Sequence, residues 1–235
     1  MSFRTFICCL FISFGAAWFS VVVYPFFQMR NIAPLEFNEA TDGVTGVFIP
    51  KRSGRVADGA RVYAENGCYA CHTQMIRPTY AGKDMFREDW AGLAQDAVRG
   101  DTRRETNFYD FEGESFAQLG MTRLGPDLSN VGRRMETTQK YGLSVEDFLF
   151  KRLYQPVLAN PELWNSVCPS HAFLFDAIDL TNGLSRNAIL DPKLPGKQLV
   201  PNADAKALVS YLAALKKDHK VPSVLNFTPK QSEKK

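Results

Sequence analysis

Hydrophobic and polar positions divide this chain into one long apolar run and a mixed remainder. Residues 5–27, TFICCLFISFGAAWFSVVVYPFF, contain no charged residue, and Arg4 and Arg30 stand on either side of the run. A helix of this length can cross a hydrocarbon core of roughly 30 Å. Aromatic residues at its far end, Trp18 among them, are typical of a membrane interface. The pattern predicts a transmembrane helix retained as an anchor over residues 1–30, because a cleaved signal peptide has a shorter apolar region.

The remainder of the chain predicts a mainly α-helical domain with long loops. Apolar residues recur at helical spacing in three segments. These are VADGARVYAENG at 56–67, SVEDFLFKRLYQP at 144–156 and NADAKALVSYLAALKKD at 202–218. The polar residues 79–122 predict loop with short helical pieces. The expected organisation is an anchor at 1–30, a tether at 31–55, a helical domain at 56–220 and a flexible tail at 221–235.

Residues with known capping preferences mark the ends of these segments. Asp58 and Ser144 can cap the first and second helices, and Gly67 and Pro156 can end them. One face of the third helix is apolar, which predicts that it packs against the rest of the domain. The residues of this face are Ala205, Leu208, Val209, Leu212 and Leu215.

The charge of the chain argues against one class of partner. Its 235 residues carry a formal charge of +3, and lysine and arginine form no cluster interleaved with aromatic residues. Nucleic-acid-binding surfaces normally show such a cluster. The composition therefore predicts no nucleic-acid partner, whereas the apolar run predicts a membrane.

The residues with the clearest chemical signal lie in ENGCYACHTQMIRP at 65–78. Two residues separate Cys68 from Cys71, and His72 follows directly. This CxxCH spacing is typical of covalently attached haem, in which both thiols bond to vinyl groups and the histidine binds the iron. A zinc site or a dithiol redox pair would also use two close cysteines.

The zinc and dithiol alternatives lack the rest of their patterns. A structural zinc site commonly draws four ligands from two close pairs. Outside the motif and the apolar run, only Cys168, His171 and His219 remain. A thioredoxin-like pair requires alternating strands and helices, which the periodicity does not show. We therefore favour covalent haem, and we expect His219, in KKDHK after the last helix, to be solvated.

Three segments of the chain carry a family resemblance. They are GARVYAENGCYACHTQMIRP, GPDLSNVGRR and SVCPSHAFLF. Together they resemble the successive signatures of subunit II of the cbb3-type cytochrome c oxidases, a membrane-anchored mono-haem subunit. The resemblance implies a class I cytochrome c-like helical domain with one covalent haem c, attached to a single transmembrane helix. It also implies a single-pass protein of the bacterial inner membrane with the haem domain on the periplasmic side.

The resemblance also assigns roles to residues around the haem. Pro126 of GPDL, next to Gly125, would offer its carbonyl to the ring N–H of His72 and so fix the tautomer of that ligand. Arg77 and Pro78 would stand beside the haem propionates. Weaker candidates for that position are Tyr80, Arg123, Arg133 and Arg134. The aromatic residues that we expect to wall the porphyrin are Tyr63, Tyr69, Phe173, Phe175 and Tyr211.

On the distal side of the iron, the chain departs from the family pattern. The family has a methionine directly before a proline, whereas this chain has Cys168 there and His171 at the position of the family's tyrosine. Either side chain can bind haem iron, and either would give a lower potential than methionine. Met121, Met135 and an open site are the remaining alternatives.

A second departure is the greater length between the CxxCH motif and GPDL. The segment near 88–104, which contains DWAGLAQDAVRGDTRR, looks inserted. Insertions of this kind fall on surface loops, so we expect this one to alter a partner surface without changing the fold.

The function implied by the resemblance is electron relay rather than catalysis. The chain shows no nucleophile with a base beside it and no phosphate-binding glycine loop. Its partners would be the haem-copper catalytic subunit that reduces oxygen, and another cytochrome c subunit or a soluble electron donor. The alternative is a membrane-anchored, low-potential c-type cytochrome that acts as a redox shuttle or sensor outside an oxidase.

Overall fold

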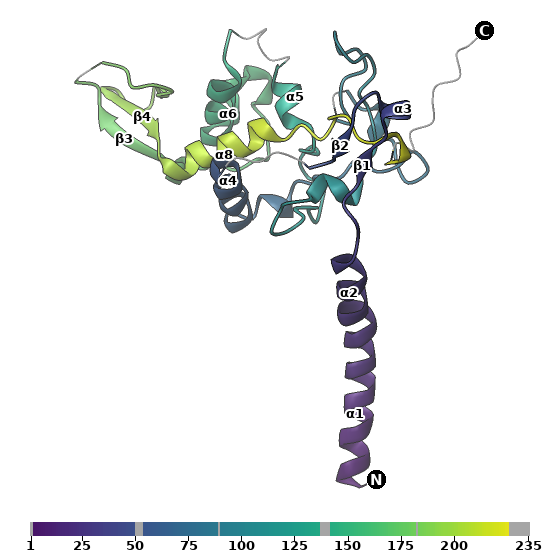
Figure 1. The fold of residues 1–235 in the computed structure, drawn as a ribbon. Coiled ribbons are helices and arrows are strands. Elements are labelled where there is room, and N and C mark those ends of the chain that lie inside the picture. The colour runs from purple at the N-terminus through teal and green to yellow at the C-terminus, as the bar shows by residue number, and fades with distance from the viewer. Residues whose placement is uncertain (1, 50–53, 89, 137–141, 182, 226–235) are drawn as a thin grey trace. The chain divides into compact units, whose positions relative to one another are not determined.

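The structure is a computed structural model that describes residues 2–49, 54–88, 90–136, 142–181 and 183–225. It contains two compact units, Met1–Phe48 and Ile49–Lys235 (Figure 1). The last ten residues of the predicted tail, 226–235, lie outside the described residues.

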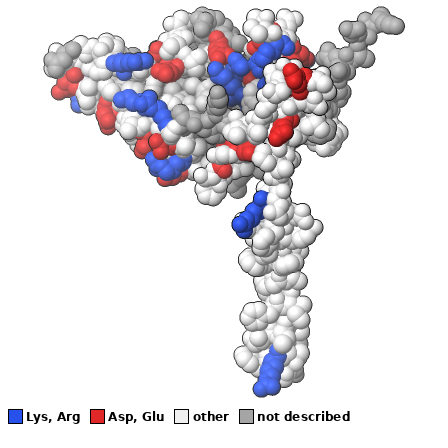
Figure 2. Space-filling model, viewed as in Figure 1, with Lys and Arg blue, Asp and Glu red and all other residues white. Residues whose placement is uncertain are grey.

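The first unit begins with one continuous apolar helix. It comprises α1 (Phe3–Trp18), a π-helical turn (Phe19–Val23) and α2 (Tyr24–Arg30). The helix is 28 residues long and contains an 18-residue window with a mean hydropathy of 2.3, none of it buried, so it is long and apolar enough to cross a membrane. Its surface in Figure 2 is white along its length, with basic residues only near the two ends. The predicted apolar helix is therefore present, with the length that a membrane span requires.

The segment predicted as an irregular tether has local structure. Strands β1 (Glu36–Phe37) and β2 (Gly46–Val47) pair antiparallel, with α3 (Glu39–Asp42) between them. The Asn38 side chain caps α3, and Gly43 ends it in the left-handed conformation. The sequence pattern did not indicate these short elements, because they are set by single capping and turn residues rather than by a repeating pattern. Residues 50–53 of the tether lie outside the described residues.

The second unit is mainly helical, as predicted. Its helices are α4 (Gly54–Glu65), α5 (Val131–Glu136), α6 (Val145–Tyr154), α7 (Pro156–Ala159) and α8 (Ala203–Ala214). Its two strands, β3 (Phe175–Asp179) and β4 (Lys197–Pro201), pair antiparallel with Phe175 opposite Pro201. Single 3-10 turns occur at Cys68–Ala70, Asp84–Phe86, Phe108–Phe111, Pro161–Leu163, Ala172–Leu174 and Ser223–Leu225.

The helix boundaries follow most of the predicted signals. Ser144 caps α6 by accepting from the backbone N–H of Asp147 at 3.1 Å. Helix α6 ends at Tyr154, and Pro156 then starts α7 because proline suits the first position of a helix. Asp58 is not a cap, since α4 already begins at Gly54. The intervening Arg-Val-Ala residues are all compatible with helix, so nothing in them delays its start.

The core of the second unit lies where α4 crosses α8, which Figure 1 shows side by side. All five residues of the predicted apolar face of α8 are buried. Gly59 of α4 makes the close crossing possible, because a β-carbon there would lie 2.6 Å from Tyr211 Cβ and closer still to the Ala207 carbonyl oxygen. The rings of Tyr63 and Tyr211 pack with centroids 5.5 Å apart.

The segment expected as a surface insertion is only partly exposed. An isolated antiparallel bridge between Asp96 and Gly100 closes its tip. Its base is buried, with Trp90, Ala91 and Thr102 at most 9% exposed. The expectation of a purely surface loop was wrong for this base, because its apolar and hydroxyl side chains pack into the unit.

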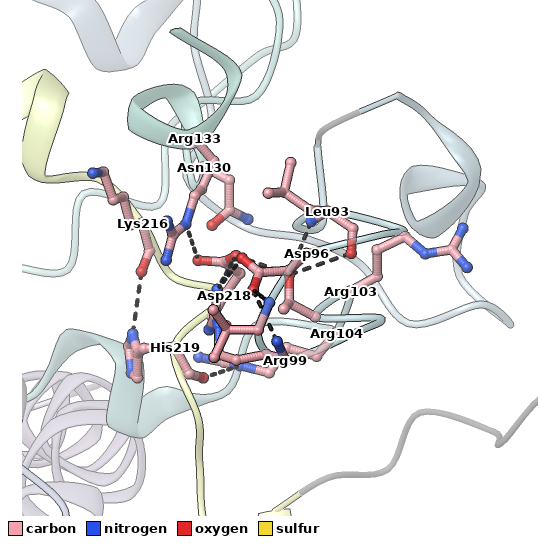
Figure 3. Close-up of polar contacts among 12 residues, drawn as sticks. Leu93, Asp96, Arg99, Arg103, Arg104, Asn130, Arg133, Lys216, Asp218 and His219 are labelled. Atoms are coloured by element: carbon pink, nitrogen blue, oxygen red, sulfur yellow. Dashed lines mark hydrogen bonds and ion pairs between the residues drawn. The ribbon is translucent and has the colours of Figure 1, made fainter. Parts of the chain in front are cut away.

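A buried carboxylate connects this segment to the chain beyond α8. Asp218 is 2% exposed and accepts from Thr102 Oγ1 at 2.9 Å, Arg99 Nη2 at 3.1 Å and Arg133 Nε at 3.0 Å. Figure 3 shows both arginines directed at this carboxylate. Gly92 allows the close approach, since a β-carbon there would lie 2.8 Å from Asp218 Cβ. The segment is thus bonded into the domain rather than appended to it.

Candidate functional site

The CxxCH motif forms a single tight turn directly after α4. Gly67, with φ of 65°, turns the chain out of the helix, a conformation that favours glycine. The backbone N–H groups of Cys71 and His72 both donate to the Cys68 carbonyl, at 3.2 and 3.0 Å. The two thiols and the imidazole therefore arise from one turn, and all three side chains are half-buried.

The imidazole of His72 is held by a backbone carbonyl from a distant part of the chain. Its Nδ1 lies 2.8 Å from the Pro126 carbonyl oxygen, 54 residues further on. A carbonyl only accepts, so Nδ1 carries the proton and Nε2 keeps its lone pair. Burial lowers the pKa of His72, while the bond to Pro126 opposes that shift. The ring is therefore neutral at neutral pH, with one nitrogen prepared to bind a metal.

Gly125 lies against the face of the same ring. A β-carbon at this position would fall 2.6 Å from Nδ1 and 2.8 Å from Nε2 of His72. Its backbone N–H also donates to the Cys71 carbonyl at 2.9 Å. Glycine is required here because any side chain would displace the imidazole, and the same contact keeps the Pro126 carbonyl beside the ring.

Asp127 fixes the register between these two segments, a role that the sequence reasoning did not assign. It is fully buried, and its carboxylate accepts from Thr73 Oγ1 at 2.7 Å, Met75 N at 2.9 Å and Ser129 N at 2.8 Å. These bonds join the chain after His72 to the chain after Pro126. The available signal was an aspartate in a Gly-Pro-Asp turn, since aspartate commonly bonds to backbone two residues on.

Arg77 is bound to a buried carboxylate rather than free to move. Its guanidinium donates to both oxygens of Asp84, at 3.1 and 3.0 Å, and Arg123 adds a third bond at 2.6 Å. Burial acts to raise the pKa of Asp84, but the two arginines outweigh it and lower the value to about 2. Gly82 leaves room for the Arg77 guanidinium, and Pro78 accepts a turn bond from the following chain. A contact between Arg77 and a propionate stays a prediction.

The weaker candidates for a contact with the haem propionates differ in the hydrogen bonds that they make within the protein. Arg134 donates to the Asp127 carbonyl at 2.7 Å, and Arg133 donates to Asp218. Tyr80 is 92% exposed. Arg134 is the weaker candidate whose positive charge acts on His72. It lowers the pKa of the imidazole, by less than burial does.

Of the two predicted distal ligands, Cys168 has an electrostatic interaction with cysteines of the motif. Burial raises the pKa of its thiol, and the charges of Arg152 and Cys71 act on it next. Burial likewise raises the pKa of Cys68 to about 11, with Cys168 as the second cause. The three thiols are therefore close enough to influence one another.

His171 has a different environment. Its ring packs near Phe173, with centroids 5.8 Å apart, and burial lowers its pKa. Its Nδ1 is buried, and hydrogen bonding to the Leu153 and Pro169 backbone opposes the effect of burial on its pKa. The ring is thus neutral, and none of the electrostatic influences on Cys68 or His72 comes from it.

The structure also describes the surroundings of Met121 and Met135, the two methionines named as alternative distal ligands. Met121 lies beside the motif, where its backbone N–H donates to the Tyr69 carbonyl at 2.8 Å, and its side chain is 74% exposed. Met135 packs against the main core. Three of the expected porphyrin walls, Tyr63, Phe175 and Tyr211, are buried in the core, whereas Tyr69 and Phe173 are exposed.

The expectation of a solvated His219 was wrong. Its side chain is 34% exposed, with Nε2 3.5 Å from Asp110 and Nδ1 3.2 Å from the Lys216 carbonyl. The chain after α8 folds back against the loops, where Arg104 donates to the His219 carbonyl at 3.3 Å (Figure 3). This histidine is therefore part of a structural network away from the motif.

Neither protein-family models nor curated proteins show a match to this chain.

Proposed function

We propose that the chain is a membrane-anchored c-type cytochrome that transfers single electrons through one covalently bound haem c. The observation that supports this most directly is the hydrogen bond from His72 Nδ1 to the Pro126 carbonyl within a CxxCH turn. A neutral imidazole with a fixed tautomer and two thiols from the same turn match the donor set that such a group needs.

Each residue of the site has a defined task in this proposal. Cys68 and Cys71 would form thioether bonds to the vinyl groups, and His72 Nε2 would bind the iron. Pro126 keeps the proton on Nδ1, and Gly125 leaves room for the ring in that one position. When bound, haem c supplies an iron that accepts and returns one electron. The protein's contribution is to hold the ligand and limit the access of water.

The proposed partner is a haem-copper oxidase of the cbb3 type, by resemblance in the sequence, with a second cytochrome c as electron donor. The haem domain would then lie on the periplasmic side of a bacterial inner membrane. A second candidate is a low-potential redox shuttle or sensor outside an oxidase, which the position of Cys168 beside the motif favours. Co-elution from detergent-solubilised membranes with a large haem- and copper-containing subunit separates the two.

The proposal is tested by the way in which haem is held. We expect the full-length protein, purified from membranes, to keep its haem through denaturation in acid acetone, because thioether bonds survive unfolding. The measurement is the absorption of the polypeptide pellet after extraction. Complete transfer of haem into the acetone would contradict the proposed function.

The distal ligand is tested by paired substitutions. We expect Cys168→Ser to abolish a thiolate-type ferric spectrum and His171→Ala to leave it, because Cys168 is the residue near the motif. The reverse pattern would identify imidazole as the ligand. A thioether-type ferric band that survives both substitutions would contradict both and point to Met121 or Met135.

A further inference from the structure

Two backbone hydrogen bonds join the CxxCH motif and the residue after it to the Gly-Pro-Asp segment. The Gly125 N–H donates to the Cys71 carbonyl at 2.9 Å, and the Leu128 N–H donates to the Thr73 carbonyl at 2.8 Å. The peptide group that follows Pro126 lies between these two bonds and takes part in neither. Its carbonyl is the one that meets the imidazole of the motif. The direction of this carbonyl therefore depends on how the next residue is held.

That next residue, Asp127, divides its bonds between the two segments. Its Oδ2 accepts from Thr73 Oγ1 at 2.7 Å and from the Met75 N–H at 2.9 Å, whereas its Oδ1 accepts from the Ser129 N–H at 2.8 Å. The side chain is fully buried. One oxygen thus bonds to the chain that follows the motif, and the other closes the turn of the Gly-Pro-Asp segment.

These contacts require a carboxylate rather than an amide. The two backbone partners can only donate, and an ionised carboxylate accepts on both oxygens. An amide in the same place would turn its NH2 group toward the N–H of either Met75 or Ser129. A buried donor that faces another donor loses its hydrogen bond, which is costly. The charge of Asp127 is in turn balanced by Arg123, whose Nη2 lies 3.9 Å from Oδ2.

We propose that Asp127 is a positioning residue for the imidazole ligand, which keeps the Pro126 carbonyl directed at Nδ1 of His72. This inference rests on the proposed function. The Pro126 carbonyl carbon is bonded to the Asp127 nitrogen in a planar peptide group, so the carbonyl turns when Asp127 moves. On both segments, the bond from Thr73 to Asp127 lies one residue beyond the bond that His72 makes. Loss of the first bond therefore loosens the second, which keeps the proton on Nδ1 and leaves Nε2 to bind the metal.

Two other roles of Asp127 compete with positioning. Its charge would act on the site whether or not the carbonyl moves, and its buried bonds would stabilise the whole domain. Thr73→Val addresses the first role, because it removes a bond to Asp127 and keeps the carboxylate. Thr102→Val addresses the second as a matched control, because Thr102 Oγ1 likewise donates to a buried carboxylate, Asp218, at 2.9 Å. That bond belongs to a different network, away from the motif.

The test is the rate at which the ring proton of His72 exchanges with solvent. It is measured by NMR on the reduced, full-length protein with covalent haem and nitrogen-15 histidine, and the chain has three histidines to distinguish. Asp127→Asn and Thr73→Val are each expected to speed the exchange about tenfold, the factor that corresponds to the net contribution of one hydrogen bond. Thr73→Ser, which keeps the hydroxyl, and Thr102→Val are expected to stay close to the parent rate.

Three results would overturn the inference. They are an unchanged rate in Thr73→Val, an equal increase in Thr73→Ser, or an equal increase in Thr102→Val. If Asp127→Asn yields no folded protein, the comparison of Thr73→Val with Thr73→Ser decides in the same way. Covalent haem with an unchanged exchange rate contradicts this inference alone. A protein without covalent haem contradicts the proposed function as well.

Discussion

A chain in which Cys68 and Cys71 are both replaced by serine is expected to carry no haem that survives denaturation. Serine is close to cysteine in size, but its oxygen does not form the thioether bond on which attachment depends. The turn itself is held by backbone hydrogen bonds to the residue 68 carbonyl, so the fold should persist. The measurement is haem staining after denaturing electrophoresis, where the parent band should be stained and the variant band should not.

Cys168 provides the control for this experiment. It is a third half-buried thiol near the motif, and it interacts with both Cys68 and Cys71. Cys168→Ser should therefore change the spectrum but keep the stained band. A stained band in the double variant, or its loss in Cys168→Ser, would contradict the assignment of the two attachment residues.

Gly59→Ala is expected to lower the free energy of unfolding by about 3 kcal/mol, at the upper end of overpacking effects. The added β-carbon would lie 2.6 Å from Tyr211 Cβ and closer to the Ala207 carbonyl oxygen, and both atoms belong to the α8 framework. Neither can move without separating α4 from α8. For a domain of this size the change corresponds to a decrease of about 6–12 °C in the thermal midpoint.

Gly54→Ala, in the same helix, is the matched control. A β-carbon at residue 54 meets no atom of the described residues within 4 Å, so the main expected change is in helix propensity. Alanine is favoured over glycine in a helix by up to about 1 kcal/mol, so this variant should be as stable as the parent or more stable. Thermal melts followed by circular dichroism in one detergent would compare the two, and equal midpoints would contradict the tight crossing.

The parts of the fold that sequence reasoning anticipated depend on neighbouring residues. The apolar run predicted a long apolar helix of membrane-spanning length. Ser144 predicted the start of α6, and the spacing of apolar residues predicted the buried face of α8. In each, a single window of sequence contains the whole physical cause, whether hydrophobic length, a capping bond or helical periodicity.

The parts that it missed depend on contacts between distant segments. Asp218 is bonded to Arg99, 119 residues away, and to Arg133, 85 residues away, so no local pattern marks it as buried. Asp84 and Asp127 likewise gain their roles from groups outside their own turns. Within the candidate site, the CxxCH spacing marked Cys68, Cys71 and His72 from the sequence, but the interaction of Arg152 with Cys168 depends on the fold.

The crossing of α4 and α8 has a consequence for the order of events during synthesis. Cys68 follows α4 and packs against the core that α8 completes, and Gln74 bonds Tyr211, 137 residues later. Contacts at such separations form late, and the N-terminal part of a chain emerges first. The motif therefore leaves the ribosome long before the helix that shields it. Under the proposed function, both thiols would be accessible for haem attachment before α8 completes this core.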